Sequence, residues 1–102
     1  MKKNQFLLLK LIEECVEVAH RASKQIQFGK NEKQKDQLYT NGARLQSELL
    51  DLFVIWKMLE DAGEIPEWTV EEAETNEQNK KAKLQKYLDL SVSLGQLPEI
   101  KL

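Results

Sequence analysis

The 102-residue sequence has few of the residues that interrupt helices, because it contains only four glycines and two prolines. Its one cysteine, Cys15, cannot form a disulfide within the chain, and a reducing compartment fits this composition. Apolar residues make up 41% of the chain and charged residues 31%, which argues against disorder and favours a helical bundle over a β-sandwich. We therefore expect an all-α fold in one domain of residues 1–102.

A large charge of one sign is also absent, since the formal net charge is -2 and the pI is near 5.5. Large nucleic acids are therefore not expected partners. The apolar stretch Leu49–Leu59 is shorter than the ~20 residues that span a bilayer, and it contains Asp51 and Lys57, so no membrane partner is expected. The segment Met1–Leu9 superficially resembles a secretory signal. However, Lys10 interrupts its apolar run Phe6–Leu9, and no small-residue cleavage site follows, so we do not expect such a signal. We expect a cytoplasmic protein.

The spacing of apolar residues predicts two long helices. Apolar residues recur every three or four positions within residues 5–28 and are dense within residues 43–62. Gly29 and Gly63 follow these segments as expected C-terminal stops. The start of the second helix stays open, because the pair Asn41-Gly42 is either a turn or a weak point inside that helix.

A third helix is expected to begin at Thr69 and Glu72, which have the spacing of a capping box, and to end near Gly95. The tail from Gln96 onward is expected to be extended. Cys15 is expected to face the core. The apolar sides of the first two helices are wider than the apolar stripe of a helix that packs against only one neighbour. We therefore expect the first two helices to pair antiparallel with the third across them, and the chain to assemble as a homodimer or homotetramer.

Acidic residues interrupt the apolar helices as two pairs, Glu14 with Glu17 and Glu48 with Asp51. Members of a pair lie three residues apart, so their carboxylates project from the same side of a helix. Two such helices side by side would form an oxygen-rich cluster that resists burial unless a cation binds, and oxygen ligands favour Mg²⁺ or Mn²⁺. In the alternative interpretation, Arg44 neutralises Glu48 and Asp51 as a structural ion pair, and the acids of the first helix form a solvated face.

The pattern Glu13-Glu14-x-x-Glu17, a spacer, then Glu48-x-x-Asp51 resembles the signature of the MazG-like all-α nucleoside triphosphate pyrophosphohydrolases over roughly residues 5–63. The resemblance implies Mg²⁺-dependent hydrolysis of nucleoside triphosphates to a monophosphate and pyrophosphate, with deoxynucleotides and altered nucleotides as candidate substrates. It implies that Glu14, Glu17, Glu48 and Asp51 hold Mg²⁺ or Mn²⁺. Under this resemblance, Glu13 is a candidate for orienting or deprotonating the attacking water and completes the expected catalytic set.

Further side chains are candidates for binding the substrate: Arg21, Lys24, Trp56, Lys80 and Lys83. A triphosphate needs cations beyond the metal, and Arg21 and Lys24 follow Glu17 by four and seven residues. Each candidate also has a plainer interpretation, as a solvated cation or, for Trp56, as a core residue. Phe28, Tyr39 and Trp68 are further candidates for contacting a ligand.

Two other functional classes stay open. Glu17 and His20 form a Glu-x-x-His pair, which together with Glu48 from two chains would complete a ferritin-like di-iron site. That interpretation leaves Glu14 and Asp51 unused. A non-catalytic helical interaction module, with the acids as ion-pair and solubility features, predicts no dependence on cations.

Overall fold

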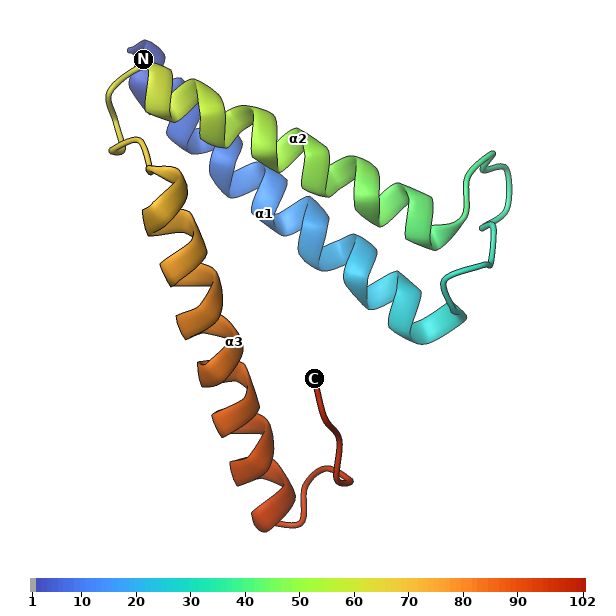
Figure 1. The fold of residues 1–102 in the computed structure, drawn as a ribbon. Helices are drawn as coiled ribbons and strands as arrows, with labels where there is room; N and C mark the ends of the chain where they lie inside the picture. Colours follow the sequence, from blue (N-terminus) through green and yellow to red (C-terminus); the bar gives the residue numbers. More distant parts are fainter. Residues whose placement is uncertain (1) are drawn as a thin grey trace. The chain divides into compact units, whose positions relative to one another are not determined.

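The structure is a computed structural model that describes residues 2–102, and these residues form three helices and no strand (Figure 1). The helices are α1 (Lys3–Phe28), α2 (Asn41–Asp61) and α3 (Val70–Ser93). The all-α expectation is confirmed. The chain divides into two compact units, one ending at Pro66 and one from Glu67 to Leu102. Within the described residues, no helix is long and apolar enough to cross a membrane.

The first unit is an antiparallel hairpin of α1 and α2, which lie side by side (Figure 1). At one end of the hairpin, the side-chain amide of Asn4 donates a hydrogen bond to the Glu64 carboxylate. At the other end, Asn41 Nδ2 donates to the carbonyl oxygen of Gly29 at 2.9 Å. The expected antiparallel pairing is therefore confirmed, whereas the expected position of α3 across it stays a prediction.

The two helices of the hairpin meet along a line of residues spaced three and four apart, which we call the α1–α2 seam. It includes Leu7, Leu11, Glu14, Val18, Arg21 and Gln25 of α1, and Asn41, Leu45, Glu48, Leu52, Ile55 and Leu59 of α2. Among the described residues, Leu7 and Leu59 are the only apolar side chains that are fully buried, and both lie at the end of the seam near the N-terminus. The rest of the seam mixes apolar residues with polar and charged ones.

Many apolar side chains of the hairpin remain exposed, including Ile12 and Val16, each with 62% of its surface accessible. The expectation that Cys15 faces the core is wrong, because Cys15 is exposed. It follows the seam residue Glu14 directly, and one step along an α-helix turns a side chain by about 100°. Trp56 is 41% exposed and packs edge to face against Phe53, with 5.7 Å between ring centroids, so one chain does not bury it in a core.

The start of α2, left open by the sequence, is Asn41. Thr40 caps the helix, because its hydroxyl accepts the N–H of the third helical residue at 3.1 Å. The N–H groups of Asn41 and Gly42 donate to the carbonyl oxygens of Glu32 and Lys30 at 2.9 and 3.0 Å. A Cβ at position 42 would lie 3.3 Å from the Lys30 oxygen, so glycine permits this close approach. Contacts with the preceding loop thus satisfy amides that a first helical turn leaves free.

The second unit consists of α3 and the C-terminal tail. Thr69 caps α3 by accepting the N–H of Glu72 at 3.1 Å, so the predicted start of this helix is confirmed. The helix ends at Ser93, before Gly95, whose φ is +75°. The tail is not helical, and the N–H of Leu102 donates to Gln85 Oε1 at 3.1 Å, which fixes the tail against α3.

Candidate metal and substrate site

Three of the predicted acids converge on the α1–α2 seam. Glu14 comes from α1, and Glu48 and Asp51 come from adjoining turns of α2. One carboxylate oxygen from each of the three lies within 4.8 Å of the others. Glu14 and Glu48 are half-buried and Asp51 is exposed at the edge of the seam. We call these residues the acidic trio.

Several carboxyl groups surround Glu14. Burial raises the pKa of Glu14, and the neighbouring carboxyl groups of Glu48, Asp51 and Glu17 raise that pKa further. Glu14 Oε2 is buried and has no hydrogen-bond partner. A free carboxylate in this position is therefore disfavoured, and its charge needs a cation or a proton to offset it.

The Arg44 side chain was the alternative source of that positive charge. Arg44 Nη1 instead donates to Gln34 Oε1 at 3.3 Å. Among the described residues, no ion pair joins Arg44 to Glu48 or Asp51. The structure thus favours the cluster interpretation over a structural ion pair with Arg44.

The donor set of the acidic trio fits a hard divalent cation. All of its donors are carboxylate oxygens, which Mg²⁺ and Mn²⁺ prefer, and the orphaned Oε2 of Glu14 leaves a ligand atom free to bind. Glu17, the fourth predicted ligand, is exposed and lies outside the trio, although its charge contributes to the raised pKa of Glu14. Glu13 also lies outside the trio and is exposed, and its Oε2 accepts a hydrogen bond from Lys10 Nζ at 2.9 Å.

Buried polar atoms without partners mark the half of the seam that runs from the trio to the 29–40 loop. Within the described residues, the four such side-chain atoms are Glu14 Oε2, Arg21 Nη1, Gln25 Oε1 and Asn41 Oδ1, and all belong to seam residues. Arg21 is 9% exposed and Asn41 is 1% exposed. Each unsatisfied buried group costs about 1–3 kcal/mol. Water or a polar ligand along this half of the seam would satisfy these atoms and offset the cost.

The predicted substrate-binding residues differ in their surroundings. Arg21 lies two helical turns beyond Glu14, and its Nη2 is 3.4 Å from His20 Nδ1. Lys24 holds its ammonium group 5.6 Å from the centre of the Phe28 ring. Lys80 and Lys83 belong to α3 in the second unit, where Lys83 Nζ lies 5.9 Å from the Tyr87 ring. The structure thus brings Arg21 to the seam, and the roles of the three lysines stay predictions.

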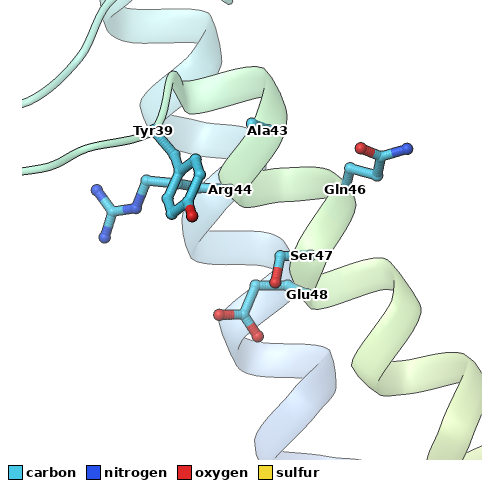
Figure 2. Close-up of a pocket in the computed structure, with 6 residues that line it drawn as sticks. All are labelled: Tyr39, Ala43, Arg44, Gln46, Ser47 and Glu48. Carbon is cyan, nitrogen blue, oxygen red and sulfur yellow. The ribbon is translucent and has the colours of Figure 1, made fainter.

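A pocket of about 450 Å³ opens beside the acidic trio (Figure 2). Its lining consists of Tyr39, Ala43, Arg44, Gln46, Ser47 and Glu48. Figure 2 shows the Arg44 and Glu48 side chains leaving α2 on the same side, with the Tyr39 ring near Arg44. Because Glu48 belongs to both the pocket and the trio, a ligand in the pocket would lie next to the acidic trio. The sequence interpretation missed Ser47 and the pocket role of Arg44, although the four-residue spacing of Arg44 and Glu48 was available as a signal.

The fold and the site together define a class of protein: an all-α chain whose first two helices form a hairpin with a carboxylate cluster in their seam. No protein-family model matches this chain, and comparison with curated proteins and with solved structures finds no match.

Proposed function

We propose that this protein is a Mg²⁺-dependent pyrophosphohydrolase that converts nucleoside triphosphates to nucleoside monophosphates and pyrophosphate. One observation carries the proposal: Glu14, Glu48 and Asp51 approach within 4.8 Å from two adjoining antiparallel helices. These residues belong to the Glu-x-x-Glu and Glu-x-x-Asp pairs on which the resemblance to the MazG-like enzymes rests.

The acidic trio would hold the cation, and Glu17 would join it as a fourth ligand by moving its exposed side chain toward Glu14. A bound Mg²⁺ supplies neutralisation of phosphate charge and lowers the pKa of a coordinated water molecule. Glu13 would orient the attacking water, which requires its ion pair with Lys10 to open. That ion pair is exposed, with 39% and 51% of the two side chains accessible, so opening it costs little.

Cations and polar groups of the chain would position the substrate along the polar half of the seam. Arg21 Nη1 is buried and unpartnered, so a phosphate oxygen there would satisfy it with a charge-assisted hydrogen bond. Arg44 is placed in the pocket next to Glu48 and could contact a second phosphate group. Tyr39 is 66% exposed at the same pocket and offers a ring face on which a base could stack.

Assembly of two or more copies is part of the proposal. A hairpin with so few buried apolar side chains has a small core, and its exposed apolar residues need a further partner. A second chain would cover Leu50, Phe53 and Val54 of α2, each about half exposed. The site lies on the same hairpin, so a second copy would also limit access of water to the substrate.

The two alternatives have less support from the geometry. A di-iron site would use Glu17 and His20, both of which lie outside the acidic trio, and His20 Nδ1 is close to Arg21. A non-catalytic interaction module would explain the exposed apolar surface but not the convergence of three carboxylates. Hydrolysis that survives His20→Ala would exclude the iron site.

The proposal is tested by measuring pyrophosphate release from the common ribonucleoside and deoxyribonucleoside triphosphates with Mg²⁺ or Mn²⁺. We expect Glu48→Gln and Asp51→Asn to lower the rate about 100-fold or more, because each removes a charged metal ligand. Asp61→Asn is the matched control, since Asp61 is an exposed acid on the same helix outside the trio. If the folded wild-type protein releases no pyrophosphate from any of these nucleotides with either cation, the assignment is wrong.

A further inference from the structure

Within the unit that contains it, α3 has no buried residue along its 24 positions. Its polar N-terminal half also offers little apolar surface of its own. Helices in proteins owe most of their stability to packing of an apolar side against a partner. We therefore expect α3 to gain stability by packing against a partner, and the charges along α3 indicate what that partner is.

Charge is divided between the two halves of α3. The first half contains Glu71, Glu72, Glu74 and Glu77, and the second half contains Lys80, Lys81, Lys83 and Lys86. Asp89 is the one acid of the helix beyond these lysines. A helix arranged in this way is complementary to itself when a second copy runs in the opposite direction, whereas a parallel copy would place like charges together.

A line of residues spaced three and four apart follows α3 in the pattern of an antiparallel coiled coil: Val70, Ala73, Glu77, Lys80, Leu84 and Tyr87. The apolar members are accessible, with 77% of Val70, 45% of Leu84 and 55% of Tyr87 exposed. The tail contacts α3 at Gln85, and its last residue, Leu102, lines a small pocket together with Lys81, Leu84 and Gln85. The tail therefore borders the line at Leu84, whereas the part of the line from Val70 to Lys80 lies outside these contacts.

We propose that α3 pairs antiparallel with α3 of a second copy of this chain. In the register that best matches both charge and size, Val70 lies opposite Tyr87, Ala73 opposite Leu84 and Glu77 opposite Lys80. The two-fold axis repeats every pair, so the interface is closed and self-complementary.

Charged residues at the centre of this interface would exchange partners. Glu77 now pairs with Lys81 of its own helix at 2.8 Å, with 61% and 73% of the two side chains exposed. An exposed pair of this kind contributes little, so little is lost when Glu77 turns to Lys80 of the second copy. Lys81 then lies near Glu74 of the second copy, on the flank of the same interface. This pairing does not depend on the proposed hydrolysis.

Disulfide trapping tests the direction and register of the pairing. With Cys15→Ser as the background, chains carrying Ala73→Cys are mixed with chains carrying Leu84→Cys under mild oxidation. We expect a crosslinked dimer from the mixture, because a disulfide forms when the Cα atoms lie about 4.4–6.8 Å apart. Each variant alone is the control, since neither cysteine faces its own copy in the antiparallel register. A crosslink formed by Ala73→Cys alone indicates parallel helices and overturns the proposal, as does a mixture that stays uncrosslinked while circular dichroism shows folded chains.

Charge exchange tests the complementarity independently. Replacing Glu74 and Glu77 by Lys in one variant, and Lys80 and Lys81 by Glu in another, should weaken self-association of each about tenfold or more, because every ion pair becomes a repulsive contact. Mixing the two variants, or combining all four substitutions in one chain, should restore crosslinking through positions 73 and 84. Equal crosslinking yield from all these variants would contradict the proposal.

Discussion

Binding of Mg²⁺ to the acidic trio should raise the thermal stability of the protein, and this response should depend on Asp51. A ligand that binds only the folded state stabilises it by about 2.7 kcal/mol when its free concentration is 100 times its dissociation constant. For a domain of this size, 1 kcal/mol corresponds to a shift in melting midpoint of about 4 °C or somewhat more. Saturating Mg²⁺ should therefore raise the midpoint of the wild-type protein by about 10 °C.

Asp51→Asn should remove most of that shift, since an amide is a much weaker ligand than a carboxylate for this cation. The same substitution should not destabilise the metal-free protein, because Asp51 is exposed and its loss relieves repulsion with Glu14 and Glu48. A metal ligand is thus recognised by a substitution that removes the Mg²⁺-induced shift in melting midpoint without lowering the midpoint of the metal-free protein. A residue needed only for folding would lower both midpoints together.

The assay is differential scanning fluorimetry in EDTA and across a titration of MgCl₂, with ionic strength held constant by NaCl. Asp61→Asn serves as the control and should keep the full wild-type shift. If Asp51→Asn shows the same Mg²⁺ shift as the wild-type protein, or if the wild-type protein shows none, the inference that the trio holds a cation is refuted.

Three further predictions follow from particular residues. The pKa of Glu14 is raised above 4.5 in the folded state, so its contribution to stability is present at lower pH and is lost as pH rises through the folded-state pKa. In EDTA, the stability of wild type relative to Glu14→Gln should therefore fall as pH rises above 4.5, and a pH-independent difference in urea melts would contradict this cause. Leu59→Ala should cost about 2–5 kcal/mol in urea unfolding, because Leu59 is 1% exposed, whereas Ile26→Ala, at an 85% exposed position, should stay within about 0.5 kcal/mol. If the pocket binds substrate, Tyr39→Ala should raise KM about tenfold with a smaller change in kcat, and an unchanged KM would exclude base stacking there.

Helices and their caps could be predicted from the sequence because those signals are local. Thr69 and Glu72 carry the cap of α3 within one turn, and Gly63 follows the end of α2 at a φ of +75°. The start of α2 could not be decided in this way. Asn41 and Gly42 resemble a turn until the carbonyl groups of the preceding loop accept their N–H groups, and those contacts depend on tertiary structure.

The candidate site was only partly predictable for a similar reason. Glu14, Glu48 and Asp51 could be expected to converge, because their positions follow from the apolar spacing of two paired helices. The exclusion of Glu17 from the trio and the exposure of Cys15 depend on the exact rotation of α1, which a broad apolar arc does not define. Tyr39 was a candidate ligand contact, but the pocket that it forms with Arg44 and Ser47 was missed, because this pocket joins the end of a loop to the flank of α2.

The polar half of the α1–α2 seam lowers the stability that the hairpin gains from its own packing. A seam filled with apolar residues at positions 14, 21, 25, 41 and 48 would stabilise the hairpin, whereas four of the residues present leave buried atoms unsatisfied. Sequences commonly depart from local stability at functional sites, and the cost is offset elsewhere. Under the proposed function, a cation at the trio and a second copy that covers exposed apolar surface would supply this compensation. Removal of the cation by EDTA should therefore lower the stability of the hairpin before it affects the pairing of α3, whose contacts involve none of the seam residues.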